Sequence, residues 1–273
     1  MRPPPAPLHA RLLNTAEIEL WPATLLRARG NADARALARS QTVLRRKRDG
    51  RYLAAVLADG LLPLVPRLAR EPGLDAALDA LDTGIAARVR GNPAVAAALP
   101  LHRLHERLLA LGVDADDYAA RTGLALVAEP EWLAYAGRDR FARPLWLTAG
   151  AARAWRAMRH AAAADGVALD AISGYRSHDY QLGIFERKRA RGQALEQILT
   201  VNAAPGYSEH HGGDALDIGT PGEPPAEESF EATPAFAWLQ AHAGDHGFAL
   251  SYPRGNRHGI VYEPWHWRFG SSF

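Results

Sequence analysis

The stretch "PGYSEHHGGDALDIG", residues 205–219, gathers two histidines, two aspartates, a glutamate and a serine around a glycine pair. If His210 and Asp217 bind one ion, the chain must reverse between them, because a fully extended chain would hold them about 23 Å apart. Gly212 and Gly213 permit the reversal, since glycine adopts positive φ angles without strain. The stretch therefore predicts a tight turn that brings ligand-type side chains together.

The segment "DALDIG", residues 214–219, alternates in the way a half-buried strand does. This alternation turns Asp217 away from the apolar layer, where a ligand belongs. Two nearby residues, His211 and Asp214, are alternative metal ligands. His211 is chemically equivalent to His210 and ranks second because adjacent side chains diverge. Asp214 lies four residues after His210, as on a metal-binding helix, but the two intervening glycines disfavour a helix there.

A third ligand is supplied by "YEPWHWRFG", residues 262–270. A strand period places its aromatic residues on one face and His266 on the other. Glu263 has an odd spacing from His266, and a bend at Pro264 would bring both to one pocket. Two imidazoles and one carboxylate suit zinc, which keeps a fourth position for water in catalytic sites. Glu263 is then left to take a proton from that water.

With these motifs the chain resembles the zinc D-alanyl-D-alanine carboxypeptidases and dipeptidases related to the vancomycin-resistance enzymes. This family shares a fold with a murein endopeptidase and the hedgehog signalling domain. Its pattern of Ser, any, His, two of any, Gly, any, Ala, any, Asp is filled by residues 208–217. The pattern Glu, any, Trp, His is filled by residues 263–266, and the family's "SGYRS" is present at residues 173–177. The resemblance spans roughly residues 130 to 273.

The resemblance favours His210 over His211 as the ligand. One departure is His178, which stands where relatives often have an aromatic residue and which affects the expected local contacts with substrate. The roles that the resemblance implies are zinc binding by His210, Asp217 and His266, general-base catalysis by Glu263, stabilisation of the oxyanion by Arg176, and peptide binding by Arg176, Gln181 and Ser208.

The function implied by the resemblance is zinc-dependent hydrolysis of the terminal D-Ala-D-Ala bond of peptidoglycan stem peptides. Within the same fold, an L,D-carboxypeptidase or an L-Ala-D-Glu endopeptidase is the near alternative, because the motifs define the chemistry and leave the position of the cut open. A zinc-bearing binding module without turnover is the distant alternative. The presence of Glu263 disfavours that module, since a structural zinc is closed by a fourth ligand and needs no base.

The 273 residues are enough for two domains, and we predict a boundary near residue 125. Residues 1–125 are expected to form an all-helical domain of unknown role. Within it, "DARALARSQTVLRRKR", residues 33–48, and "LHRLHERLLALG", residues 101–112, have the charge or leucine pattern of helices. Residues 126–273 are expected to form an α+β catalytic domain with helices flanking a mainly antiparallel sheet. The last strands are expected in "FALSYP", "GIVYE" and "WHWRF".

Composition limits the partners, metal ligands and cellular locations that are expected. Thirty-two Lys and Arg residues nearly balance thirty Asp and Glu residues, so the net charge of +2 predicts no nucleic-acid partner. Cysteine is absent, and any metal must be held by His, Asp or Glu. No stretch has the roughly 18 apolar residues of a membrane span, and the proline-rich N-terminus lacks the apolar run of a signal peptide. A cytoplasmic location is therefore expected, with a periplasmic or cell-wall location as the alternative.

Overall fold

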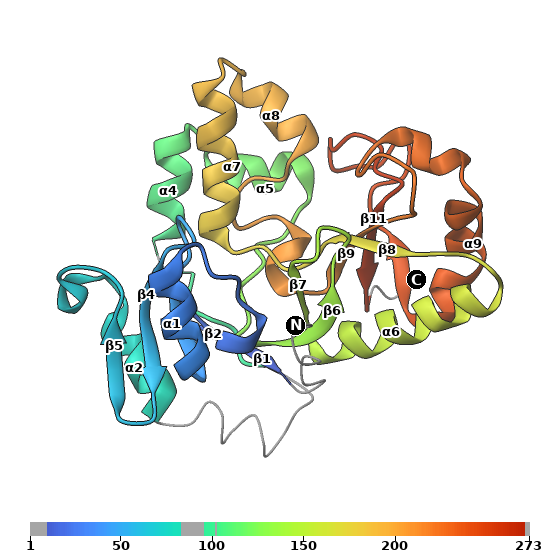
Figure 1. Ribbon diagram of the computed structural model, residues 1–273. Helices are drawn as coiled ribbons and strands as arrows, with labels where there is room; N and C mark the ends of the chain where they lie inside the picture. Colours follow the sequence, from blue (N-terminus) through green and yellow to red (C-terminus); the bar gives the residue numbers. More distant parts are fainter. Residues whose placement is uncertain (1–9, 83–95, 102, 271–273) are drawn as a thin grey trace.

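The computed structural model describes residues 10–82, 96–101 and 103–270 (Figure 1). Two antiparallel sheets with helices around them form this part of the chain, as the predicted α+β class requires. The larger sheet has seven strands in the order β5-β4-β3-β2-β1-β6-β7. Its strands are β1 (Arg11–Asn14), β2 (Ile18–Pro22), β3 (Thr42–Arg46), β4 (Tyr52–Leu57), β5 (Gly60–Pro63), β6 (Trp132–Arg138) and β7 (Pro144–Leu147).

The prediction of an all-helical domain over residues 1–125 is wrong, because this region supplies five strands of the larger sheet. The segment 33–48 shows why. Its first part is helix α1 (Asn31–Arg39), but the chain is extended from Ser40 and continues as β3. Val43 and Leu44 are fully buried between β2 and β4, so packing within the sheet outweighs the helical charge pattern.

The larger sheet also crosses the predicted boundary. β1 pairs with β6 in antiparallel register, with Leu12 opposite Leu133, and β6 pairs with β7. Strands before and after residue 125 therefore share one hydrogen-bonded sheet. The division into units 1–125 and 126–273 stays a prediction.

The smaller sheet has the order β10-β11-β9-β8 and lies in the C-terminal half, as predicted. The segments "FALSYP" and "WHWRF" supply β10 and β11, whereas "GIVYE" forms no strand and that prediction is wrong. Residues of "GIVYE" instead form a loop whose backbone bonds include Val261 N to Thr200 O and Glu263 N to Tyr252 O. The strands are β8 (Asp170–Ser173), β9 (Ala215–Gly219), β10 (Phe248–Leu250) and β11 (His266–Phe269).

Helices cover both sheets and lie at the ends of the molecule (Figure 1). Residues 104–111 of the leucine-striped segment form α4 (Leu104–Leu111), which ends at Gly112 in the left-handed conformation, as expected for a helix cap. Residue 102 of that segment lies outside the described residues. The remaining α-helices are α2 (Leu74–Asp82), α5 (Ala115–Thr122), α6 (Ala149–Ala164), α7 (His178–Ala190), α8 (Leu195–Val201) and α9 (Pro234–His242), and the 3-10 turns are η1 (Ala23–Leu25), η2 (Leu68–Arg70), η3 (Glu209–Gly212), η4 (Glu228–Ala232) and η5 (Ala243–His246).

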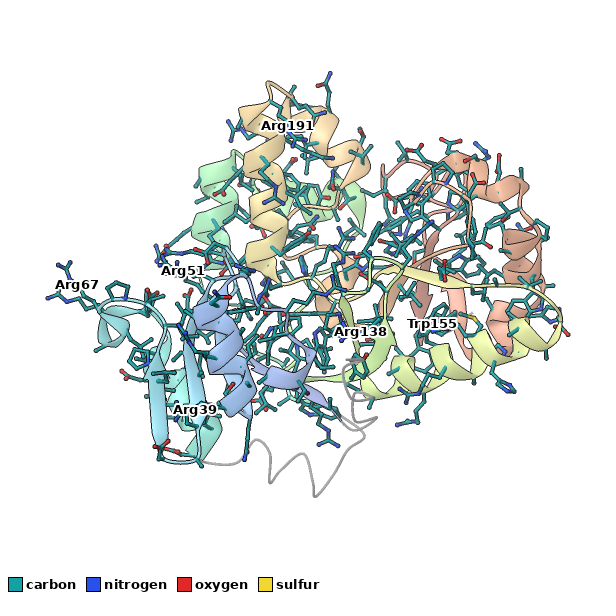
Figure 2. The ribbon with its side chains drawn as sticks, in the orientation of Figure 1. Arg39, Arg51, Arg67, Arg138, Trp155 and Arg191 are labelled. Atoms are coloured by element: carbon teal, nitrogen blue, oxygen red, sulfur yellow. The ribbon has the colours of Figure 1, made fainter. Side chains whose placement is uncertain are left out.

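The largest hydrophobic core lies between α6, α9 and the smaller sheet. Trp155 on α6 is completely buried there (Figure 2), and Trp267 of β11 packs into the same core. The predicted aromatic face of residues 265–269 is confirmed by this packing, which leaves the opposite face of β11 free for polar residues. In the part of the chain that the structure describes, no helix combines the length and the apolar content needed to span a membrane.

Candidate metal and catalytic site

Strand register brings the first two candidate ligands together. β9 and β11 run antiparallel with His266 directly opposite Asp217. Residues opposite each other on one face have Cβ atoms about 5 Å apart, within reach of a shared ion. His266 Nδ1 lies 3.2 Å from Asp217 Oδ1, and both residues are buried. Leu216 and Ile218 pack in the largest hydrophobic core and Asp217 does not, so the predicted alternation along this strand is confirmed.

His210 reaches the same point from η3, which precedes β9. Only Gly213 of the glycine pair has a positive φ (+77°), and a Cβ at this position would lie 2.4 Å from Leu133 Cδ2. The turn therefore requires glycine at position 213 for conformation and for space. It places His210 Nε2 3.3 Å from Asp217 Oδ1.

The second ring nitrogen of His210 determines which nitrogen is available for a metal. His210 Nδ1 lies 2.8 Å from the carbonyl oxygen of Gly174, so Nδ1 carries the proton and donates it. Nε2 is buried and has no hydrogen-bond partner within the described residues. A buried nitrogen with a free lone pair needs a partner, and backbone bonding at the other nitrogen is how histidine ligands of metals are oriented.

The three residues satisfy the requirements of a zinc site. One ligand atom from each of His210, Asp217 and His266 lies within 4.8 Å of the other two, and all three residues are buried. Two imidazoles with one carboxylate match the donor set of catalytic zinc, which leaves a coordination position open. The structure thus assembles the three residues that the sequence singles out, with an orphaned nitrogen at their centre.

Glu209 completes the surroundings of His266. His266 Nε2 lies 2.9 Å from Glu209 Oε2, so each nitrogen of this imidazole contacts a carboxylate. Burial lowers the pKa of His266, but Asp217 and Glu209 outweigh burial and raise it to about 10. This pocket therefore favours positive charge. No local pattern indicates the contact, because Glu209 and His266 are 57 residues apart.

Glu263 lies beside the three candidate ligands. The predicted bend is present, since His266 N donates to the carbonyl oxygen of Glu263 at 3.1 Å across Pro264. Glu263 Oε2 lies 3.8 Å from His266 Nδ1, and 12% of its side chain is exposed. Burial raises the pKa of Glu263 to about 7, although the charge of His266 acts to lower it. A carboxylate with a pKa near neutrality can accept a proton and return it.

The residues predicted to contact the peptide line the same site. Arg176 Nη2 lies 3.9 Å from Asp217 Oδ2, and Arg176 Nε is buried without a partner among the described residues. Gln181 Nε2 donates to the carbonyl oxygen of Ala203, which leaves Gln181 Oε1 buried and unpaired in the same part of the chain. Ser208 is buried, and together with Gln181, Arg176, Glu263 and two of the candidate ligands it borders a small cavity.

The competing ligand candidates have other partners. His211 Nδ1 lies 2.7 Å from the carbonyl oxygen of Arg176, and His211 Nε2 accepts a hydrogen bond from Gly206 N, so both ring nitrogens are used. Asp214 accepts a hydrogen bond from Thr148 Oγ1 and is absent from the three-residue cluster. The preference for His210 and Asp217 over these neighbours therefore agrees with the geometry.

A buried carboxylate joins the larger sheet to the loop that carries Arg176, and the sequence analysis missed it. Glu129 accepts hydrogen bonds from Lys47 Nζ, Tyr175 Oη and the backbone N of His178. Tyr175 and His178 stand on the two sides of Arg176 in the chain. His178 also contacts the carbonyl oxygen of Val127 through Nε2. It thus holds the loop at a position where relatives often have an aromatic residue.

The contacts of Glu129 predict how its contribution to stability depends on pH. Burial acts to raise the pKa of Glu129, but Lys47, His178 and hydrogen bonds outweigh it and lower the pKa to about 2. A folded-state pKa below the unfolded value of about 4.3 stabilises the protein above that value. This stability is lost as pH falls from about 4.3 toward 2.

We therefore expect the difference in unfolding free energy between wild type and Glu129→Gln to be large at pH 7 and to shrink below about pH 4.3. Urea denaturation at a series of pH values measures this difference. Glu106→Gln, at an exposed ion pair, is the matched control and should have little effect at any pH. A difference that does not change between pH 7 and pH 3 would contradict the assignment.

Comparison with known proteins finds similarity within the C-terminal half of the chain. The model of the VanY D-alanyl-D-alanine carboxypeptidase family matches residues 144–272. The putative carboxypeptidase YodJ of Bacillus subtilis (strain 168) is 38% identical over 126 residues, which are 44% of this chain and 44% of YodJ. The D-alanyl-D-alanine carboxypeptidase of Enterococcus faecium is 35% identical over 99 residues, covering 36% of this chain and 28% of that protein. The chain therefore spans less than half the length of either relative.

Among solved structures, a mutant of the vancomycin-resistance D,D-pentapeptidase VanY in complex with Zn(II) is 29% identical to this chain. Its match covers 46% of this chain and 74% of the other, with a TM-score of 0.39. The two candidate ligand motifs and the "SGYRS" segment lie wholly inside residues 144–272. The strands β1 to β6 lie outside them.

Proposed function

We propose that the protein is a zinc-dependent carboxypeptidase, a proposal supported by the match of residues 144–272 to the VanY D-alanyl-D-alanine carboxypeptidase family model. Its substrates would be peptidoglycan stem peptides, from which it releases the terminal D-alanine by hydrolysing the D-Ala-D-Ala bond. The observation that carries the proposal is the buried cluster of His210, Asp217 and His266 with Glu263 beside it. This set of residues supplies both a metal site and a separate base.

His210, Asp217 and His266 would hold the zinc ion, with Nε2 of His210 and Nδ1 of His266 as the nitrogen donors. Bound there, zinc would act as a Lewis acid that polarises the scissile carbonyl and lowers the pKa of the attacking water from 15.7 to about 7. Glu209 would orient His266 by accepting the hydrogen bond from Nε2. The metal thus replaces the positive charge that the surrounding carboxylates already favour.

Glu263 would accept a proton from the attacking water and pass it to the departing amine. Its raised pKa, about 7, suits both transfers near neutral pH. Arg176 would stabilise the negative charge that develops on the carbonyl oxygen, because its guanidinium lies at the edge of the cluster and its Nε lacks an acceptor within the described residues. Gln181 and Ser208, which line the small cavity, would bind the peptide.

An L,D-carboxypeptidase would use the same chemistry on a different final bond, and an L-Ala-D-Glu endopeptidase would cut within the peptide.

Release of D-alanine from a UDP-muramyl pentapeptide tests the proposed function, using wild-type protein, zinc-stripped protein, and stripped protein with zinc restored. We expect release by the first and third preparations and a loss of release by the second. Magnesium added in place of zinc is the control and should not restore activity, because magnesium prefers oxygen ligands. If zinc binds at one equivalent and neither pentapeptide, tetrapeptide nor dipeptide is cut, an endopeptidase or a binding module without turnover becomes the better account.

A further inference from the structure

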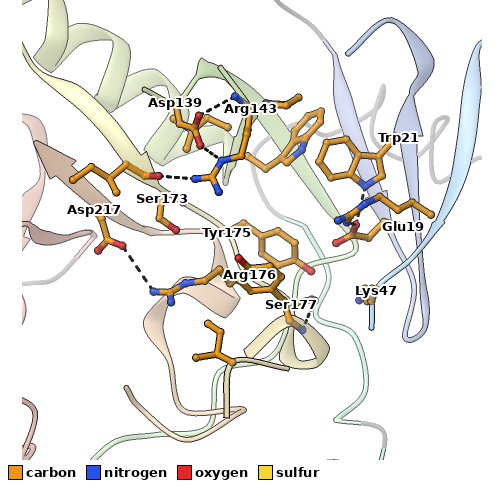
Figure 3. Close-up of a pocket in the computed structure, with 18 residues that line it drawn as sticks. Glu19, Trp21, Lys47, Asp139, Arg143, Ser173, Tyr175, Arg176, Ser177 and Asp217 are labelled. Atoms are coloured by element: carbon orange, nitrogen blue, oxygen red, sulfur yellow. Dashed lines mark hydrogen bonds and ion pairs between the residues drawn. The ribbon is translucent and has the colours of Figure 1, made fainter. Parts of the chain in front are cut away.

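A second, much larger cavity opens on the other side of Arg176. It has a volume of about 340 Å³, and both Arg176 and Asp217 line it (Figure 3). The small cavity beside Glu263 is also lined by Arg176, so this arginine borders both spaces. The large cavity has about ten times the volume of the small one.

The far wall of the large cavity comes from the N-terminal strands. Trp21 of β2 and Arg45 of β3 line it, and both lie outside the residues that match the carboxypeptidase family. Figure 3 shows Trp21 and Glu19 facing the cavity from the end opposite Asp217. This wall thus belongs to the seven-stranded sheet and not to the family domain.

Buried contacts hold this wall in place. Glu19 has a side chain that is 4% exposed, and its Oε2 accepts hydrogen bonds from Trp21 Nε1 at 2.7 Å and from Arg45 Nη1 at 2.5 Å. The guanidinium of Arg45 lies over the Trp21 ring, 5.1 Å from its centroid. Trp21 also packs edge-to-face on Trp146, with ring centroids 5.3 Å apart. The indole is therefore fixed before any ligand arrives, which reduces the entropy lost on binding.

The lining offers what a peptide backbone needs. Arg176 lines the cavity with a side chain that is 21% exposed, and its guanidinium carries N–H donors. Carbonyl oxygens of an extended peptide are acceptors for such groups. The aromatic rings of Trp21, Tyr175 and Trp146 give apolar area against which side chains can pack. Cavities of 300 Å³ and above are of the size that buries such a ligand.

We propose that this groove binds the acyl part of the substrate, an extended oligopeptide of at least three residues, with the Trp21 wall as its far subsite. The inference rests on the proposed function for the direction of the peptide. The small cavity of about 30 Å³ has no room for an oligopeptide, so the part of the peptide that precedes the cut extends into the large one. The N-terminal sheet consequently favours oligopeptides over the free dipeptide D-Ala-D-Ala.

Binding and turnover are measured together to test the groove. Binding of the pentapeptide and of D-Ala-D-Ala is measured by calorimetry on zinc-loaded Glu263→Gln protein, with and without Trp21→Ala. Turnover is measured as kcat/KM for both peptides on protein that retains Glu263, again with and without Trp21→Ala. We expect Trp21→Ala to weaken pentapeptide binding and to lower its kcat/KM by about tenfold or more, as for a buried aromatic anchor. The effect on the dipeptide should be much smaller.

Two variants keep the test specific. Trp21→Phe retains the ring that packs on Trp146 and should give an intermediate loss, and its thermal unfolding shows whether the sheet remains folded. Arg51→Ala, at an exposed position beside β4 that does not line the cavity, should change neither peptide (Figure 2).

The outcomes separate the groove from the proposed function. If Trp21→Ala affects both peptides by the same factor, or leaves the pentapeptide unaffected, the groove proposal is overturned even when wild type releases D-alanine. If the pentapeptide binds with the expected dependence on Trp21 but is not cut, the groove is supported and the proposed reaction is overturned.

Discussion

Glu263→Gln is expected to reduce D-alanine release by about 10² to 10⁴-fold, the usual contribution of a positioned general base. Glutamine has nearly the same shape, and Glu263 is mostly buried, so the substitution should fit the same space. An amide cannot accept the proton of the attacking water near neutral pH. Without proton transfer to residue 263, the activation barrier to hydrolysis rises. The three candidate zinc ligands, His210, Asp217 and His266, stay in place.

Zinc content and turnover must be measured on the same samples to separate the base from the metal site. Glu263→Gln should keep one equivalent of zinc and lose most of its kcat with little change in KM. His210→Ala removes a ligand and should lose zinc and activity together, and Glu106→Gln, an exposed carboxylate, should change neither. If Glu263→Gln retains more than a tenth of the wild-type kcat, another group transfers the proton.

The site could be predicted from sequence because short-range patterns define it. His210, Gly213 and Asp217 lie within eight residues, and one turn followed by one strand is enough to orient them. Glu263 and His266 likewise need only a bend and the start of a strand. What the sequence did not contain locally is the pairing of β9 with β11, which places His266 opposite Asp217. His266 was predicted as the third ligand from the strand period of residues 262–270, without a prediction of this pairing.

The N-terminal half was predicted wrongly because its structure depends on distant pairing. The stretch after Ser40 has the charges of a helix end, yet β3 lies between β2 and β4 and buries Val43 and Leu44. Arginine and lysine at the end of that strand then meet carboxylates from other segments. Glu129 is 82 residues from Lys47, so no local pattern could indicate their contact. Tertiary packing outweighs helix propensity in such segments.

The hydrogen bonds of Glu129 connect the N-terminal sheet to the loop around Arg176. The carboxylate accepts hydrogen bonds from Tyr175 and from the backbone of His178, while Lys47, the residue after β3, neutralises its charge. Arg176 lies between those two positions in the chain. The N-terminal sheet is thus bonded to the loop that presents the proposed oxyanion-stabilising group.

Lys47→Met is therefore expected to destabilise the fold by about 3–5 kcal/mol, the cost of leaving one partner of a buried ion pair uncompensated. Lys47 Nζ lies 2.5 Å from Glu129 Oε2, and the two side chains are 1% and 5% exposed. Methionine nearly preserves the apolar stem of lysine, so the substitution leaves little empty space. The lost stability therefore comes mainly from the unpaired charge of Glu129. Urea denaturation at pH 7 measures the change, and an activity assay on the folded fraction should show a lower kcat.

The double variant Lys47→Met/Glu129→Gln supplies the decisive comparison, because removing the second charge should recover part of the stability lost in Lys47→Met. Arg254→Ala is the control, since this arginine forms exposed ion pairs with Glu228 and Glu231 and should cost at most about 1 kcal/mol. Additive losses in the double variant would mean that Lys47 and Glu129 act independently. Recovery of stability together with persistently low kcat would instead show that the charge of Glu129 is needed to hold the loop around Arg176 in its active arrangement.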